Sequence, residues 1–153
     1  MVEEGQQAPD FTLQSDAGEQ VSLSQFRGTP VVLYFYPADD TPGCTAQACG
    51  FRDDWEAYQE RGAVILGVSP DDVDSHVSFK DKYALPFTLL ADPDHEVTER
   101  YGFWGQKSFA GKKYMGVERS TVVIGADGTV EKVFRRVKPA DHAAQVLNAL
   151  GSS

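Results

Sequence analysis

The 153 residues of this chain are enough for one domain, and a hydrophobic content of 41% is enough to fill its core. The 23 acidic and 14 basic residues give a net charge of −9, which disfavours binding to nucleic-acid phosphates and to anionic membrane surfaces. No window approaches the roughly 18 continuous apolar residues of a membrane span, and the first residues lack the basic-then-apolar order of a secretory signal. We therefore expect one domain, residues 1–153, that is cytoplasmic and has no nucleic-acid or membrane partner.

The first half of the chain predicts a hairpin and then a strand–helix–strand unit. A Ser-Asp-Ala-Gly turn between two short segments favours the hairpin, and two apolar runs around a periodic helix favour the unit. Such a βαβ unit implies parallel pairing and a right-handed crossover. The expected elements are hairpin strands at 11–13 and 20–23, a turn at 24–28, a buried strand at 31–36, a helix from about Pro42 to Arg61, and a buried strand at 63–69.

The second half predicts two capped helices, a third strand, and a pair of strands before the last helix. Ser69-Pro70 and Asp92-Pro93 each place a capping residue before a proline, which favours a helix start at these points. Asp127-Gly128 is a short hairpin signal, so the strands around it should be antiparallel. The expected elements are a helix at 69–83, a strand at 86–91, a helix from 92 that Gly102 closes, an aromatic and glycine-rich loop at 103–115, strands at 119–125 and 128–137, a helix from Pro139, and a frayed tail at 151–153.

Together these elements predict an α/β fold in which a mixed central sheet is flanked by helices on both faces and carries an extra N-terminal hairpin. The arrangement looks thioredoxin-like. The long loop at 103–115 is a candidate wall for a functional site, because long loops in compact domains are usually functional.

Both cysteines of the chain lie in one stretch, residues 37–49, which reads PADDTPGCTAQAC. Cys44 follows the first buried strand and lies in the first turn of the predicted helix. Unpaired N–H groups and the positive end of the helix dipole favour a thiolate there, which makes Cys44 a candidate nucleophile. Cys44 also begins an apolar stripe with helical spacing, and Cys49 lies off that stripe. The other members of the stripe are Ala48, Phe51, Trp55 and Tyr58.

Four interpretations of the two cysteines are open from the residues: a redox pair, half of a zinc site, a permanent disulfide, or two unrelated buried thiols. Zinc needs about four ligands with recognisable spacing, so no metal is expected from three scattered histidines, His76, His95 and His142. A permanent disulfide fits poorly, because five residues of α-helix place two Cα atoms roughly 8.6 Å apart, beyond the roughly 4.4–6.8 Å of a disulfide. If Cys44 and Cys49 form a bond, the helix between them must unwind locally.

Three adjacent acidic pairs could suggest a cation site. Neighbouring residues point in different directions, and no pair belongs to a calcium-loop pattern. We interpret the pairs as a solvated acidic surface. They are Asp39-Asp40, Asp53-Asp54 and Asp71-Asp72.

The redox interpretation has a specific chemistry. A thiolate with a second cysteine nearby suits oxidation to a sulfenic acid, which then condenses with the second thiol, and hydroperoxide is the natural oxidant. The departing peroxide oxygen gains negative charge and needs hydrogen-bond donors. Thr41, three residues before Cys44, can supply a hydroxyl, and a positive side chain must come from elsewhere in the chain.

Pro37, Thr41 and Cys44 form the pattern P-x-x-x-T-x-x-C, which resembles the active-site motif of the peroxiredoxins. The segments TPGCTAQAC, APDFTL, YGFWGQKSFAGKKYMGVERST and ADGTV are similar to the bacterioferritin comigratory protein (peroxiredoxin Q) subfamily, so the resemblance covers nearly the whole chain. It implies that Cys44 is the peroxidatic cysteine and Cys49 the resolving cysteine. It also implies that Arg119 stabilises the thiolate and bound peroxide, that Thr41 hydrogen-bonds the peroxide, and that Pro37 shields the sulfur from water.

Three of these roles have simpler alternatives. Thr41 can be only the N-cap of the helix, and Pro37 can be only a strand terminator. Arg119 can be an ordinary surface or edge-strand arginine.

The resemblance further implies a thiol-dependent peroxidase for hydrogen peroxide and organic hydroperoxides, with an intrachain Cys44–Cys49 disulfide, thioredoxin or a similar dithiol as reductant, and no cofactor. The chain lacks a GGLG segment and a C-terminal cysteine, which mark the dimeric two-cysteine peroxiredoxins, so a monomer is expected. One rival function is a thiol–disulfide oxidoreductase, against which the missing Cys-x-x-Cys counts. Another is a redox sensor whose helix unwinds on oxidation.

Overall fold

The computed structural model describes residues 2–139 and 142–150, and only the backbone of residue 109. The described strands are β1 (Thr12–Ser15), β2 (Gln20–Ser22), β3 (Val31–Phe35), β4 (Val64–Ser69), β5 (Thr88–Ala91), β6 (Trp104–Phe109), β7 (Lys112–Val117), β8 (Ser120–Ile124) and β9 (Val130–Phe134). The described helices are the 3₁₀ helix η1 (Leu23–Phe26) and the α-helices α1 (Pro42–Asp53), α2 (Trp55–Glu60), α3 (Val73–Tyr83), α4 (Glu96–Tyr101) and α5 (His142–Leu150). None of these helices combines the length and apolar character needed to cross a membrane.

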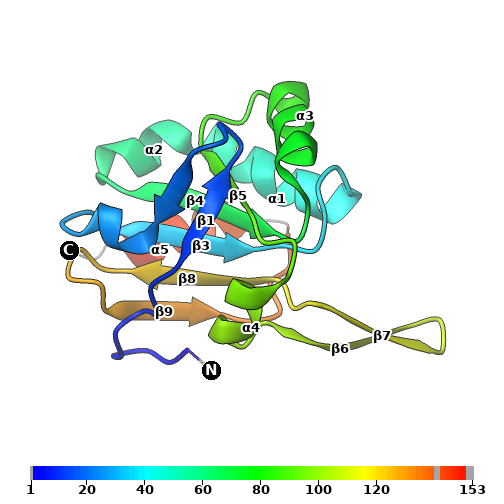
Figure 1. Cartoon of the computed structure of the whole chain (residues 1–153). Coiled ribbons are helices and arrows are strands. Elements are labelled where there is room, and N and C mark those ends of the chain that lie inside the picture. Colours follow the sequence, from blue (N-terminus) through cyan, green and yellow to red (C-terminus); the bar gives the residue numbers. More distant parts are fainter. Residues whose placement is uncertain (1, 140–141, 151–153) are drawn as a thin grey trace.

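Seven of the described strands form one mixed sheet in the order β2-β1-β5-β4-β3-β8-β9 (Figure 1). Strand β3 lies inside this sheet, parallel to β4 and antiparallel to β8. The segment from β3 through α1 and α2 to β4 is the expected βαβ unit, and β1–β2 and β8–β9 are the expected antiparallel hairpins. The prediction of a mixed sheet with an N-terminal hairpin is therefore confirmed.

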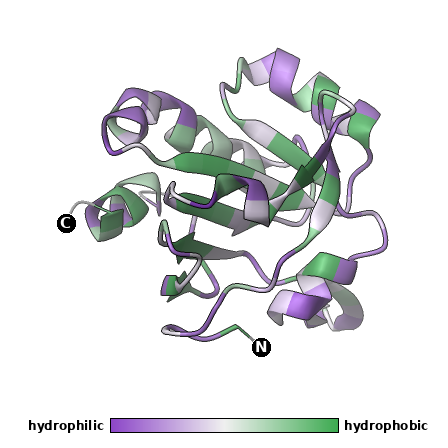
Figure 2. Cartoon of the chain, turned by 60° about the vertical axis from the view of Figure 1, so that its left-hand side comes forward, coloured by the Kyte–Doolittle hydropathy of each residue, from purple (hydrophilic) through white to green (hydrophobic). Residues whose placement is uncertain are grey.

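The side chains of β3 alternate between two cores, one on each face of the sheet. Val31, Leu33 and Phe35 join the core that α4 covers, and Val32 and Tyr34 join the core that α1, α2, α3 and α5 cover. Figure 2 shows the apolar residues concentrated in the sheet strands and on the inner sides of the helices. The chain that leaves the carboxyl end of β3 is therefore anchored on both faces of the sheet.

The helix predicted from Pro42 to Arg61 is interrupted at Asp54, so α1 and α2 take its place. Asp54 has φ −95° and ψ 8°, which is the sparsely allowed region between helix and strand. The predicted inward stripe nevertheless continues across the interruption. Its members are the buried Cys44, Ala48, Phe51 and Tyr58 and the partly buried Trp55.

The start of α3 lies later than the cap-and-proline pattern predicts. Ser69 is the last residue of β4 and does not cap the helix. The N-cap is Asp72, whose carboxylate accepts a hydrogen bond from the N–H of Ser75 at 2.8 Å, and the helix begins at Val73. The strand takes Ser69 because β4 pairs with β5 up to that residue.

The start of α4 is also later than predicted. The helix begins at Glu96, after His95 in the left-handed conformation with φ 48°. The Asp92 carboxylate still accepts hydrogen bonds from the N–H groups of Val97 at 3.3 Å and Thr98 at 2.9 Å. Asp92 therefore stabilises the open end of the helix from a distance, although it is not the N-cap.

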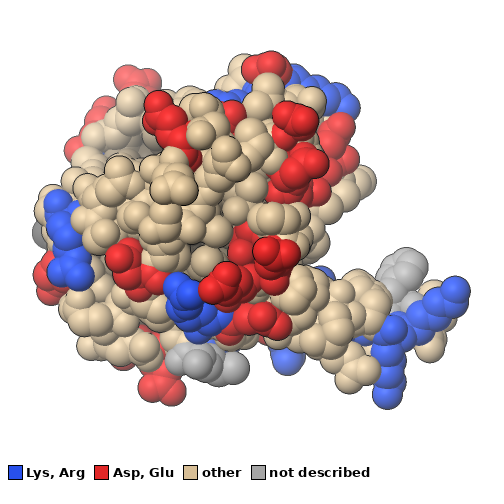
Figure 3. All heavy atoms as spheres, in the orientation of Figure 1, with Lys and Arg blue, Asp and Glu red and all other residues tan. Residues whose placement is uncertain are grey.

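Residues 103–115 do not form the expected irregular loop. Strands β6 and β7 pair as an antiparallel hairpin outside the main sheet, and the hairpin projects from the body (Figure 1). Its turn contains Ala110 and Gly111, both with positive φ, and Ala-Gly is not one of the Asn-Gly or Asp-Gly signals of such turns. Lys112 and Lys113 lie near the tip, whereas acidic side chains predominate on the face of the body seen in Figure 3.

The last described helix, α5, has the expected inner face. Ala143 and Val146 are buried, and Leu147 and Leu150 pack against the same core. The start expected at Pro139 adjoins residues 140–141, which lie outside the described residues, as does the frayed tail expected at 151–153.

Candidate active site

Cys44 lies where the chain passes from the carboxyl end of β3 into the first turn of α1. Pro42 is the first helical residue, and Thr41 before it has an extended backbone with φ −102° and ψ 154°. Cys44 is a free thiol with only 1% of its surface exposed. The open N–H groups and the helix dipole therefore act on this sulfur, and both favour negative charge there.

The Thr41 hydroxyl does not cap the helix. It makes no capping hydrogen bond and instead donates to the carbonyl oxygen of Ala38 at 3.0 Å. A plain N-cap thus explains the place of Thr41 in the chain but not the direction of its side chain. With its proton used on Ala38, the hydroxyl oxygen keeps lone pairs that can accept from another donor.

Arg119 reaches Cys44 from 75 positions along the chain. Its Nη2 donates to the Cys44 Sγ at 3.2 Å, and its Nη1 donates to Oε1 of Gln47 at 2.7 Å. Arg119 directly precedes β8, an interior strand of the sheet, so the description as an ordinary surface or edge-strand arginine does not fit. The guanidinium is in a position to stabilise negative charge on the sulfur, and its second hydrogen bond fixes its orientation.

Gly43 leaves the space that the Arg119 guanidinium occupies. A Cβ at position 43 would lie 3.1 Å from Arg119 Nη2 and 3.4 Å from Cγ of Pro139. Gly43 is helical, so its importance lies in this close approach and not in backbone freedom.

Gly43→Ala should slow the alkylation of Cys44 by iodoacetamide about tenfold, because a displaced guanidinium gives the sulfur a weaker charge-assisted hydrogen bond. The matched control is Gly50→Ala in the same helix, whose Cβ would meet only the Cβ of Ala143 at an ordinary 3.5 Å. Second-order alkylation rates at one pH measure both variants. Unchanged alkylation in Gly43→Ala would contradict this role for Gly43.

Cys49 is a free thiol in the same helix as Cys44, and it is only half-buried. Ideal helix geometry places the two Cα atoms roughly 8.6 Å apart. The structure therefore shows a dithiol with α1 folded. A bond between the two sulfurs requires part of α1 to unwind, and the partial exposure of Cys49 argues against two unrelated core thiols.

Pro37 lies at an open pocket between the loop after β3 and the hairpin β6–β7. The pocket has a volume of about 220 Å³, and the hairpin contributes Trp104, Lys107, Tyr114 and Met115 to its lining. The segment that was expected to form a wall of the site lines this pocket as a hairpin, together with Pro37. Its exposed Tyr114 and Met115 give this side of the site an apolar surface.

Sequence reasoning missed two polar groups near Arg119. Gln47 could have been found, because it follows Cys44 by three residues and so shares its helix face. His142 had no local signal; its Nε2 lies 2.7 Å from Oγ1 of Thr121 in the core. Burial, together with the positive charge of Arg119, lowers the pKa of His142 to about 4, so this ring is neutral at pH 7 and adds no charge beside the guanidinium.

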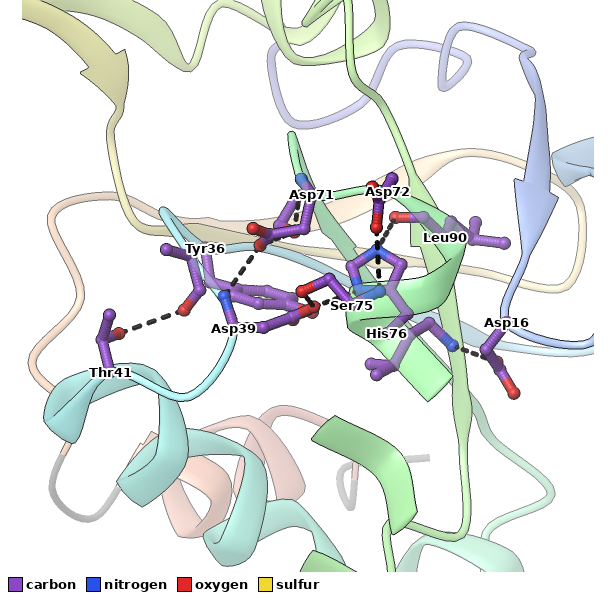
Figure 4. A network of polar contacts seen from close by, with 12 residues as sticks. Asp16, Tyr36, Asp39, Thr41, Asp71, Asp72, Ser75, His76 and Leu90 are labelled. Carbon is purple, nitrogen blue, oxygen red and sulfur yellow. Dashed lines mark hydrogen bonds and ion pairs between the residues drawn. The ribbon is translucent and has the colours of Figure 1, made fainter. Parts of the chain in front are cut away.

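The expectation that the acidic pairs form only a solvated surface is wrong for Asp39. Its side chain is 4% exposed and pairs with His76, whose side chain is 0% exposed (Figure 4). Asp40 and Asp53 follow the expectation, with 43% and 67% of their side chains exposed. Within residues 2–139 and 142–150, no group of three or more His, Cys, Asp and Glu side chains could hold a metal ion.

Residues 4–133 match the sequence model of the AhpC/TSA family. The chain is 52% identical over 149 residues to a putative peroxiredoxin bcp of Coxiella burnetii, which corresponds to 97% of this chain and 99% of that protein. It is 50% identical over 149 residues to the peroxiredoxin Bcp of Bacillus subtilis, with 97% of this chain and 95% of that protein covered.

Solved structures show the same similarity. A structure of the bacterioferritin comigratory protein of Xanthomonas campestris, described for its alkyl peroxide reduction activity, has a TM-score of 0.87 and 38% identity, covering 92% of this chain and 89% of that one. A cysteine mutant of the peroxiredoxin Q of Xylella fastidiosa has a TM-score of 0.93 and 31% identity, with coverages of 98% and 96%. These similarities confirm the thioredoxin-like α/β fold predicted from the sequence.

Proposed function

The chain belongs to the AhpC/TSA family of peroxiredoxins, and from this premise we propose that Cys44 is the cysteine that attacks the peroxide and Cys49 the cysteine that resolves it. As a peroxiredoxin, the protein is a peroxidase, an oxidoreductase that reduces peroxide with a thiol. The observation that carries the assignment is the hydrogen bond from Nη2 of Arg119 to Sγ of Cys44 at 3.2 Å. A cation at a cysteine in the first turn of a helix favours the nucleophilic thiolate.

In the first step the Cys44 thiolate attacks one oxygen of a hydroperoxide. An S–O bond forms as the O–O bond breaks, the departing oxygen takes a proton and leaves as water or an alcohol, and the sulfur becomes a sulfenic acid. The Arg119 guanidinium can stabilise both the thiolate and the charge that develops on the peroxide. The lone pairs of the Thr41 hydroxyl can accept the peroxide proton, because that hydroxyl already donates to Ala38. Pro37 covers one side of the site and limits access by water.

In the second step the thiol of Cys49 attacks the sulfenic sulfur of Cys44. The new S–S bond displaces the sulfenic oxygen, which leaves as water with the thiol proton. Because both residues lie in α1, this step is accompanied by local unwinding of the helix. The oxidised and reduced forms therefore differ in backbone structure as well as in one bond.

The finer features of the cycle are part of the same proposal. The substrates are hydrogen peroxide and organic hydroperoxides, and the alkyl group of the latter would lie against the hairpin side of the pocket at Pro37. Thioredoxin or a similar dithiol reduces the disulfide. The proposal also makes the enzyme a cytoplasmic single-domain monomer, in which both proposed cysteines lie in one helix.

The test is oxidation of the reduced protein with one equivalent of hydrogen peroxide, followed by mass spectrometry of the intact chain and its peptides. We expect a product two hydrogens lighter with a Cys44–Cys49 cross-link. Cys49→Ser should instead gain one oxygen on Cys44 and complete one turnover, but should lose most of its recycling by thioredoxin, thioredoxin reductase and NADPH.

Full multiple-turnover activity of Cys49→Ser would refute the resolving role. Insulin reduction in the absence of peroxide would support the rival thiol–disulfide oxidoreductase. A peroxide reaction too slow to consume one equivalent would remove the peroxidase assignment of Cys44.

A further inference from the structure

Asp39 fastens the loop of residues 37–41 to helix α3. Its Oδ2 accepts hydrogen bonds from Oγ of Ser75 at 2.8 Å and from Nδ1 of His76 at 2.7 Å, and its Oδ1 accepts from Oη of Tyr36 at 2.6 Å (Figure 4). A single carboxylate thus takes three hydrogen bonds while only 4% of its side chain is exposed. This loop is the segment that places Thr41 and the first turn of α1.

A second set of contacts holds the same loop at its surface. The Asp40 carboxylate accepts from Nζ of Lys82 at 2.8 Å and from Oη of Tyr83 at 2.7 Å. Lys82 is 58% exposed and Asp40 43%, so water and salt weaken this tether. The N–H of Asp39 also donates to Oδ2 of Asp71 at 2.7 Å. The buried contacts of Asp39 therefore hold the loop more firmly than the exposed contacts of Asp40.

His76 is held by acceptors on both sides of its ring. Nδ1 faces the Asp39 carboxylate at 2.7 Å, and Nε2 faces the carbonyl oxygen of Leu90 at 2.9 Å (Figure 4). A carboxylate and a carbonyl can only accept, so both bonds form only when both ring nitrogens carry a proton. The pair is then a buried imidazolium and carboxylate, and removal of either partner leaves the other without compensation.

We propose that the Asp39–His76 ion pair is a positioning pair for the peroxide site, which holds residues 37–41 on α3 so that Thr41 and Pro37 stay beside Cys44. Neither Asp39 nor His76 contacts the sulfur. This inference rests on the proposed role of Cys44, and it adds the demand that His76 be charged for full activity.

The charges around His76 agree with a charged ring. Burial alone lowers the pKa of His76, but the hydrogen bond and negative charge of Asp39, the carbonyl of Leu90 and the charge of Asp71 together raise it above its usual value. On α3, Lys80 is paired with Asp16 at 3.0 Å and Lys82 with Asp40 at 2.8 Å, so each ammonium already has a carboxylate partner. The titratable and charged groups that face the ring are Tyr36 directly after β3, Asp39 on the loop and Asp71 before α3.

The sign of the pH effect follows from this raised pKa. Below the pKa of the folded protein, His76 carries both protons and both hydrogen bonds are made. As the pH rises through that pKa, one nitrogen loses its proton and either Asp39 or Leu90 faces a lone pair, so the loop loses its ion pair with α3 and is held less firmly. The rate constant of Cys44 with peroxide should therefore fall on the alkaline side.

The experiment measures the second-order rate constant with hydrogen peroxide from pH 5 to 9 alongside the ring nitrogen signals of His76 by NMR. In the wild type we expect both nitrogens of His76 to be protonated at pH 7 and to titrate at the same pH as the alkaline fall in rate. Asp39→Asn and His76→Gln should lower the rate constant at pH 7 by about 10- to 100-fold and abolish the alkaline fall. His95→Gln, which removes a histidine outside the network, should keep it.

Thermal unfolding of the variants shows whether a lower rate constant reflects lost folding or lost positioning of the loop. The comparison of the wild-type pH–rate profile with the NMR titration of His76 needs no variant. A neutral His76 at pH 7, or an alkaline fall that persists in a folded His76→Gln, would overturn the positioning pair. Neither result would affect the proposed function, which fails only if Cys44 itself does not react with peroxide.

Discussion

Replacing Cys44 with serine should abolish peroxide reduction, with a loss on the order of 10⁴-fold or more in kcat/KM. A serine hydroxyl is of nearly the same size but does not ionise near neutral pH, so Arg119 and the helix end have no anion to stabilise. The loss should appear in peroxide consumption with thioredoxin and in the single-turnover reaction without it. Cys44 is only 1% exposed, and a serine fits in its place without overpacking, so the variant should keep the fold.

Cys49→Ser is the matched control for this loss, because it makes the same substitution in the same helix but should keep the first turnover. Circular dichroism and thermal unfolding of both variants check the fold. If Cys44→Ser still consumed peroxide at the wild-type rate, the nucleophile would have to be sought elsewhere in the chain.

Arg119→Met should lower kcat/KM for hydrogen peroxide by about 10²- to 10³-fold, the usual loss when one donor to a developing charge is removed. Methionine keeps an unbranched side chain of similar length but gives up the hydrogen bond to the Cys44 Sγ at 3.2 Å. The kcat/KM of Arg119→Lys should lie between those of the wild type and Arg119→Met. An ammonium keeps the charge but cannot hydrogen-bond both the sulfur and Gln47 in one plane. Stopped-flow rate constants measure the series.

The control for Arg119 is Arg136→Met, which removes a guanidinium that is 88% exposed and pairs with Glu118 at 3.4 Å. It should change the rate constant by less than about twofold, because exposed ion pairs contribute little. Gln47→Ala tests the orientation of the guanidinium: its effect in the wild type should vanish in the Arg119→Met background, since the two residues act as a unit. Additive effects would mean that Gln47 acts independently of Arg119.

Strands β3 and β4 could be predicted because their apolar residues run without interruption, as in strands buried on both faces. The helix starts at α3 and α4 could not be placed to the residue. Ser69 and Asp92 have the right chemistry for a cap, but Ser69 ends a strand and Asp92 accepts from N–H groups five and six residues later. The hairpin β6–β7 was missed because Ala110 adopts a positive φ, which is not predicted for an alanine.

For the candidate site as well, local sequence signals point to some residues, and others depend on contacts between distant parts of the chain. Thr41 and Cys44 could be proposed as site residues from local spacing, because a loop and a helix turn bring neighbours in the chain together. Arg119 came from the family resemblance alone, since nothing in one arginine shows which distant residue it will meet. The pairing of Asp39 with His76 depends on how α3 packs against the loop, and adjacent aspartates suggested a solvated surface instead.

The place of β3 between β4 and β8 also sets an order in which the site can be completed during folding. Strand β4 follows β3 after a single helical crossover, whereas β8 arrives only near the end of the chain and brings Arg119 with it. Closing the longer loop costs more chain entropy, so this pairing is the slower one to form. A chain still emerging from the ribosome, or one whose last strands have detached, therefore holds Cys44 without its guanidinium. With the role proposed for Arg119, we expect the thiol to reach its full reactivity only after β8 has joined the sheet.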